Sequence, residues 1–107
     1  MPKPSTKSSA KKTKSYNKPW LAEKSKIKNA SGLHARATAL FVTLAKQFLA
    51  NVEIGKEGQY VNGKSILAVL MLGALQGETI TIRTKGPQAK EALEQLKKLV
   101  ELGFNEL

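Results

Sequence analysis

The sequence predicts a two-layer α+β fold in which three helices cover one face of a four-stranded antiparallel sheet. Four short segments show the alternating apolar and polar residues of strands, and three segments of helix-forming residues fall between and after them, in the order β-α-β-β-α-β-α. The 107 residues fit one domain, and a hydrophobic fraction of 41% suffices for a modest core. Stacking one helical layer on one sheet buries the apolar face of each.

The first strand is predicted over residues 22–29, where Ile27 is the clearest residue to point inward. Residues 29–32, Asn-Ala-Ser-Gly, have the composition of a turn. This turn delivers Leu33 and His34 to the start of the first helix.

That helix is predicted over residues 35–49. One of its faces carries apolar residues at spacings of three and four, namely Ala37, Phe41, Ala45 and Phe48, with Leu44 beside them. Residues 51–56 then alternate as a strand through Val52 and Ile54. A turn at 57–58 leads to the returning strand at 59–62, so these residues predict a hairpin.

A short second helix is predicted between two capping residues, Ser65 at its N-terminus and Gly73 at its C-terminus. Its apolar residues run all the way round the helix rather than along one stripe. A helix that packs on a sheet needs apolar residues on only one of its faces.

The last strand is predicted over residues 78–84, where Ile80 and Ile82 alternate with threonines. Gly86-Pro87 ends it and is predicted to open the last helix, with the proline in the first turn. The inner face of that helix is formed by Leu93, Leu96 and Val100. Gly103 followed by Phe104 predicts a Schellman-type end with a hydrophobic contact.

The net charge of +10 is concentrated at the start of the chain. Residues 1–18 hold six lysines and no acid, whereas residues 29–107 hold nine basic and seven acidic residues. Lys, Ser, Thr and Pro dominate residues 1–18, which bury too little apolar surface to offset the entropy of ordering. We therefore expect a disordered basic tail over 1–20 and a folded domain over 21–107. A basic tail of this kind is able to touch nucleic acid or an anionic membrane, and it also favours solubility.

Composition excludes several classes of site. The chain has no cysteine and one histidine, which excludes disulfides, thiolate catalysis and multi-histidine metal sites. No apolar run approaches the ~20 residues of a membrane span, and no secretory segment follows the start. We expect a cytoplasmic protein that needs no metal or cofactor.

The residues that carry chemistry are Gly32-Leu33-His34-Ala35-Arg36. An imidazole is a competent nucleophile toward phosphorus at neutral pH. A phosphate on His34 would meet the free backbone N–H groups of the first helical turn, including those of Ala35 and Ala37, and the positive end of the helix dipole. Arg36 supplies a charge-assisted contact to the phosphate oxygens. No acid is obviously paired with His34, so the sequence shows no acid–base dyad.

At these residues the sequence resembles a known family. GLHAR at a helix start, VNGKSILAVLMLG about thirty residues later, then QGETITI and a closing helix are similar to HPr, the histidine phosphocarrier protein of the bacterial phosphoenolpyruvate-dependent sugar phosphotransferase system. The resemblance covers about residues 22–104 and implies the open-faced β-sandwich of that family. It implies that Enzyme I phosphorylates His34, that Arg36 binds the phosphate, and that Enzyme IIA domains receive it. A monomer is the family expectation.

The resemblance also implies a regulatory and a docking role for the second helix. In many relatives the serine matching Ser65 is phosphorylated by HPr kinase/phosphorylase, which weakens docking to Enzyme I; as an N-cap, Ser65 needs no such role. We expect Val69 and Leu72 to pack on the sheet. An outward docking patch is then left to Ile66, Leu67, Leu70 and Met71, unless Trp20 and the tail cover it. Lys46 and Lys64 are candidates for a polar rim.

One departure from the family motif is Ala37, which stands where the family has proline. Alanine continues the helix but loses the fixed φ of proline. This leaves open a regulatory branch, comparable to nitrogen-related phosphotransferase carriers or to regulators that dock without carrying phosphate. A nucleic-acid-binding domain is disfavoured because the strands offer only Tyr60 for base stacking. An enzyme acting alone is disfavoured because His34 has no obvious partner.

Overall fold

The computed structural model describes residues 19–107, so the expectations for the tail over 1–18 lie outside the described residues. The elements follow the predicted order and have these bounds: β1 Leu21–Lys26, α2 Ala35–Ala45, β2 Asn51–Lys56, β3 Gln59–Asn62, α3 Ile66–Leu72, β4 Thr79–Lys85, α4 Ala89–Glu101 and a one-turn 3₁₀ helix, η1, Gly103–Asn105. The 3₁₀ turn was not predicted.

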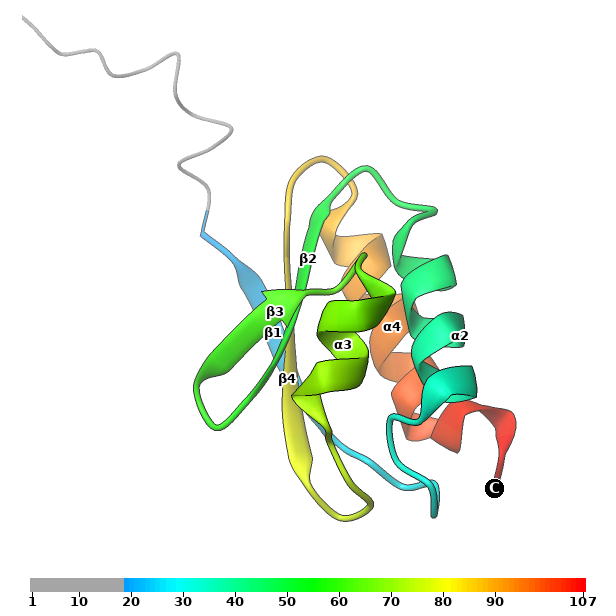
Figure 1. The fold of residues 1–107 in the computed structure, drawn as a ribbon. Coiled ribbons are helices and arrows are strands. Elements are labelled where there is room, and N and C mark those ends of the chain that lie inside the picture. The colour runs from blue at the N-terminus through cyan, green and yellow to red at the C-terminus, as the bar shows by residue number, and fades with distance from the viewer. Residues whose placement is uncertain (1–18) are drawn as a thin grey trace, which may run out of the picture.

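The four strands form one antiparallel sheet in the order β1-β4-β2-β3. Figure 1 shows the three helices together on one side of this sheet, and no helix of residues 19–107 lies on the other side. The predicted fold class, an α+β open-faced sandwich with three helices on one face, is therefore confirmed. Within residues 19–107, no helix is both long and apolar enough to cross a bilayer.

The core lies between the two layers. Alternate residues of the central strands point into it, and the inner faces of α2 and α4 meet them; the side chains exposed by 2% or less include Phe41, Val52, Ile54, Val69, Ile80, Ile82, Leu96, Val100 and Phe104. Ile27 is also buried, as predicted, although it lies just after β1. The alternation in β2 and β4 thus identified the buried residues correctly.

The end of α2 differs from the prediction, because the helix stops at Ala45 instead of Leu49. After Lys46 the chain turns toward the start of α4. There the backbone N–H of Leu49 donates to the side-chain oxygen of Gln88 at 2.7 Å, and the carbonyl of Leu49 accepts from the Gln88 N–H at 2.9 Å. These bonds to a distant segment compete with further helical turns, and they overrule the helix propensity of residues 46–49.

Other boundaries differ by smaller amounts. β1 covers 21–26 instead of 22–29, since the main chain of Ile27 bonds to the loop at 77–78 and no longer to β4. β4 correspondingly begins at Thr79. Pro87 lies before the N-cap of α4, Gln88, so the expectation of a proline in the first turn is wrong.

Local caps behave as predicted at α3. The Ser65 hydroxyl accepts the Ala68 N–H at 3.2 Å, and Gly73 ends the helix with φ +66°. Val69 is fully buried and Leu72 packs against the core, as expected. The short helix therefore presents one edge to the core and the rest outward.

Candidate functional site

His34 is the N-cap residue of α2. Its backbone is extended, with φ −79° and ψ −177°, and its carbonyl accepts the Thr38 N–H at 2.9 Å. The imidazole Nδ1 accepts the backbone N–H of Arg36 at 3.2 Å. Because Nδ1 accepts, the proton of the neutral ring lies on Nε2. The side chain is 32% exposed, so the imidazole is anchored at the helix start and still open to solvent.

The loop before His34 is held close to the end of α3. Gly32 has φ +62°, and a Cβ built on it would lie 2.5 Å from the Ala74 carbonyl oxygen. Leu33 donates its N–H to that same oxygen at 2.9 Å and is itself buried. Only glycine fits both the left-handed conformation and the close approach. This contact positions the His34 backbone against α3.

A carboxylate that sequence reasoning missed lies on the other side of the ring. Oε2 of Glu106 is 2.7 Å from Nε2 of His34, and Oε1 accepts a hydrogen bond from Nδ2 of Asn29 at 3.0 Å. The expectation that His34 has no acidic partner is therefore wrong. The two residues are 72 positions apart, and the fold brings them together by closing η1 over the His34 loop.

The environment of Glu106 favours its ionised form. The hydrogen bond from Asn29, the contact with His34 and the positive charge of Arg36 together hold the pKa of the Glu106 carboxyl below its usual range. An anionic oxygen therefore faces Nε2 at neutral pH. This arrangement leaves Nδ1 as the ring nitrogen with an available lone pair once the Arg36 N–H is displaced or shared.

The groups near Nδ1 are the exposed residue Arg36 and backbone N–H groups at the start of α2. Arg36 is exposed, and among residues 19–107 no carboxylate forms an ion pair with it. The N–H of Arg36 itself contacts Nδ1, whereas the prediction named those of Ala35 and Ala37. Within the described chain, the N–H groups of Ala35 and Ala37 donate to no other backbone group. The Ala37 side chain is fully buried, so alanine in place of proline fits the core.

The outward residues of α3 form an exposed apolar surface next to this site. Its members are Ile66, Leu67, Leu70 and Met71, which are exposed by 49%, 66%, 38% and 75%. Leu75, 62% exposed in the following loop, lies against Gly32 and extends this surface toward His34. We call these five residues the α3 patch. Leu75 was not predicted, because a single apolar residue in a loop has no periodicity to identify it.

The loop that carries Leu75 is fixed by a charged residue. Oε1 of Glu78 accepts the Leu75 N–H at 2.7 Å and lies 3.2 Å from Nζ of Lys56. The Leu75 amide and the Lys56 ammonium lower the pKa of the Glu78 carboxyl. These two contacts of Glu78 hold Leu75, the member of the α3 patch nearest the His34 loop, in position.

The two rim candidates differ. Lys46 is exposed at the end of α2, while Nζ of Lys64 donates to the Phe48 carbonyl at 2.9 Å. Lys64 therefore closes the turn after α2. Trp20 does not cover α3, since its ring stacks on Arg83, whose guanidinium carbon is 4.8 Å from the ring centre.

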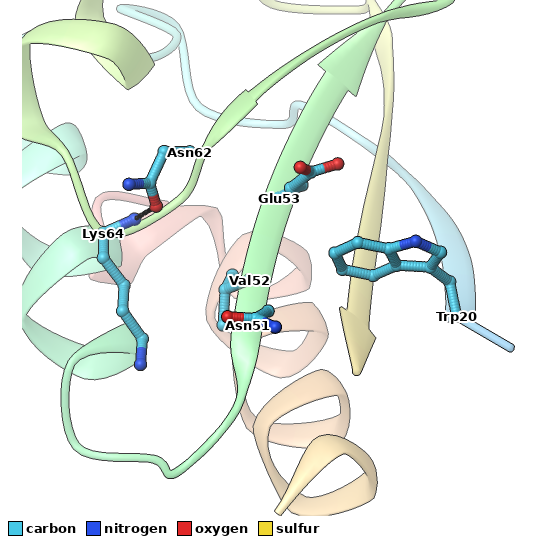
Figure 2. A pocket seen from close by; sticks show the side chains of 6 residues that line it. All are labelled: Trp20, Asn51, Val52, Glu53, Asn62 and Lys64. Carbon is cyan, nitrogen blue, oxygen red and sulfur yellow. Dashed lines mark hydrogen bonds between the residues drawn. The ribbon is translucent and has the colours of Figure 1, made fainter. Parts of the chain in front are cut away.

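The sheet carries a separate surface pocket of about 390 Å³. Figure 2 shows the Trp20 ring over β4 and pointing toward β2, which carries Asn51 and Glu53; Asn62 and Lys64 line the pocket on the far side of β2. Neither His34 nor any residue of the α3 patch lines this pocket. It is therefore distinct from the site at the start of α2.

Comparison with known proteins agrees with the geometry. The family model described as "PTS HPr component phosphorylation site" matches residues 21–101. The chain is 42% identical over 80 residues to phosphocarrier protein HPr of Cupriavidus necator, and 43% identical over 81 residues to that of Pseudomonas aeruginosa; each match covers 75% of this chain and 90% of the relative.

Solved structures give the same result. The crystal structure of HPr from Thermoanaerobacter tengcongensis superimposes with a TM-score of 0.78 at 37% identity, covering 81% of this chain and 98% of that one. HPr from Bacillus anthracis gives a TM-score of 0.74 at 40% identity, covering 78% and 99%. The chain therefore belongs to the HPr family, the histidine phosphocarrier proteins of the bacterial phosphotransferase system.

Proposed function

We propose that this protein accepts a phosphoryl group from phospho-Enzyme I on Nδ1 of His34 and donates it to Enzyme IIA domains. The observation that carries the proposal is the orientation of the imidazole, with Nε2 against a carboxylate and Nδ1 toward the first N–H groups of α2. A phosphoryl group on Nδ1 would therefore lie at the helix N-terminus, where free N–H groups and the dipole favour an anion.

Arg36 completes the proposed anion site. Its guanidinium is exposed and follows the nucleophile by two residues. Such a group binds phosphate oxygens through charge-assisted, bidentate hydrogen bonds. The protein would act as a stoichiometric carrier, in which the partners supply the remaining catalytic groups. A regulator that only docks would have no need of the oriented His34.

The direct test is phosphoryl transfer in two stages. The protein is incubated with phosphoenolpyruvate and Enzyme I, and its intact mass is read before and after brief acid treatment. We expect one acid-labile phosphate, which an Enzyme IIA domain then removes. Absence of phosphate with the cognate Enzyme I would contradict the carrier function. We further propose that the protein is cytoplasmic and, as the family resemblance implies, a monomer.

The α3 patch is the proposed docking surface for Enzyme I and Enzyme IIA, with Lys46 on its polar rim. Exposed apolar side chains of this kind mark partner sites, and methionine adapts to several partners. We expect Met71→Glu to slow phosphoryl acceptance by roughly tenfold, because a charge would be desolvated at the interface. Steady-state kinetics with a fixed catalytic amount of Enzyme I and a varied concentration of the carrier would measure the loss as a raised KM for the carrier.

The matched control for Met71→Glu is Leu21→Glu. Leu21 is 40% exposed and begins β1, at the far end of that strand from the His34 loop. We expect Leu21→Glu to leave acceptance within twofold of wild type. Equal losses in the two variants would argue against docking at the α3 patch.

Ser65 is the proposed regulatory phosphorylation site for HPr kinase/phosphorylase. Its hydroxyl caps α3 and lies at the edge of the α3 patch. A phosphate there would place a dianion beside the apolar contact and oppose docking. We expect Ser65→Asp to keep the cap and slow acceptance, and Ser65→Ala to lower the free energy of unfolding by about 1 kcal/mol with normal acceptance.

Two measurements separate these effects. Denaturant unfolding measures the cap, and Enzyme I kinetics measure docking. Normal acceptance by Ser65→Asp would remove the argument for regulation at this position.

A further inference from the structure

We propose that Glu106 is a positioning residue that keeps a proton on Nε2 of His34 throughout the phosphoryl-transfer cycle. The inference rests on the proposed function and deepens it. Its starting observation is the 2.7 Å contact between Oε2 of Glu106 and Nε2, on the ring nitrogen opposite the one that would carry phosphate.

Buried groups fix the position of Glu106. Asn29 is 1% exposed, and its Nδ2 donates both to the Gly32 carbonyl at 2.8 Å and to Oε1 of Glu106 at 3.0 Å. Exchanging the amide oxygen and nitrogen of Asn29 would place its oxygen against two other acceptors, so the amide has one satisfactory orientation. Asn29 therefore holds one carboxylate oxygen and leaves the other for His34.

The backbone around Glu106 is also anchored. Its N–H donates to the Gly103 carbonyl at 2.9 Å, closing the η1 turn, and the Phe104 side chain of that turn is 1% exposed in the core. The Glu106 side chain is only 24% exposed, although it lies on a surface turn. The contact with His34 is therefore supported by packing, unlike an ion pair between two mobile surface side chains.

The charged groups near the ring are Glu106, whose carboxylate contacts Nε2, and Arg36, whose positive charge acts on that carboxylate. Arg36 and the Asn29 amide both favour the ionised carboxylate. Glu106 thus retains its negative charge at the pH where transfer occurs, and a phosphoryl group on Nδ1 would lie on the ring nitrogen opposite the one that Glu106 contacts. The two anions would be separated by the imidazole.

During acceptance, the lone pair of Nδ1 forms a bond to phosphorus. The bond between phosphorus and the donor breaks at the same time, and the electron pair of that bond stays with the donor. Nε2 keeps its proton, so the phosphorylated ring carries a positive charge opposite the Glu106 carboxylate. During donation the P–Nδ1 bond breaks and its electron pair returns to Nδ1. The product is neutral imidazole, which is a far better leaving group than the imidazolate that a deprotonated ring would give.

The first test does not require phosphorylation. Long-range ¹H–¹⁵N spectra of the neutral ring report which nitrogen of His34 carries the proton. We expect the Nε2–H form to dominate in wild type and to lose population in Glu106→Gln, a substitution that keeps shape and removes charge. Glu101→Gln is the matched control, because Glu101 pairs with Lys97 on α4 and has no contact with His34.

The second test measures donation. The rate of phosphoryl transfer from the phosphorylated protein to an Enzyme IIA domain is compared between variants. Above neutral pH we expect Glu106→Gln to lower this rate roughly tenfold. In acid we expect a smaller loss, because the ring is protonated there without the help of Glu106. Glu101→Gln should follow wild type at every pH. This pH-dependent difference is one that a purely structural role for Glu106 would not produce.

The outcomes separate the two claims. If wild type accepts phosphate and Glu106→Gln matches it in proton position and in the pH profile, the role of Glu106 is wrong while the carrier function stands. If wild type accepts no phosphate, the carrier function fails, and the role of Glu106 in transfer fails with it.

Discussion

His34→Asn is expected to abolish phosphorylation by Enzyme I completely while the protein stays folded. The variant removes the only imidazole in the chain, so no histidine remains to form the acid-labile bond. Asparagine is among the best N-cap residues, so the start of α2 keeps a side-chain acceptor for the helix N–H groups. Alanine would lose that cap, at a cost of about 1 kcal/mol, and would mix a folding effect with the chemical one.

Intact mass after incubation with phosphoenolpyruvate and Enzyme I measures the effect, and thermal unfolding checks the fold. We expect the wild-type chain to gain one phosphate and His34→Asn to gain none, with melting temperatures within a few degrees. An acid-labile phosphate on His34→Asn would show that another residue is the acceptor, and would overturn the assignment of the site.

Phe104→Ala is expected to cause the largest loss of stability among the substitutions considered. The ring is 1% exposed and belongs to the buried hydrophobic core. Removing a buried phenyl ring leaves a cavity and costs about 3–5 kcal/mol, a large part of the ~5–15 kcal/mol that stabilises a domain of this size. Denaturant unfolding would measure the loss.

The same substitution should also disturb His34, because Phe104 anchors the turn that carries Glu106. We expect the proton of the neutral imidazole to become less confined to Nε2 in Phe104→Ala, even under conditions where the protein remains folded. Leu102→Ala is the control, since Leu102 is 49% exposed one residue before this turn. If Phe104→Ala remains stable and the proton of the His34 ring stays on Nε2, the turn that carries Glu106 does not need the buried Phe104 ring to hold it in place.

The sequence predicted best where the information is local. The N-cap hydroxyl of Ser65 and the left-handed Gly73 act within a few residues, and both ends of α3 were placed correctly. The alternation in β2 and β4 likewise identified Ile54 and Ile82 as buried. These features depend on residues only a few positions apart in the sequence, so the sequence alone is enough to predict them.

The features that were missed depend on tertiary contacts. Residues up to Leu49 favour a helix, but bonds to Gln88 pull the chain away after Ala45. Glu106 was not identified because nothing in its neighbourhood points to His34, 72 residues earlier. The nucleophile and its arginine were recognisable from the motif at the helix start, whereas the third group of the site is visible only once the fold is closed.

The long separation between Glu106 and His34 has a consequence for the order of folding. A contact that closes a loop of this length forms late, because the entropy of the intervening chain must be lost first. A partly folded chain with α2 already in place would present an imidazole whose Nε2 has no carboxylate. The imidazole would acquire its full chemistry only when the turn after α4 docks, so the reactivity of His34 would report that the whole domain is assembled.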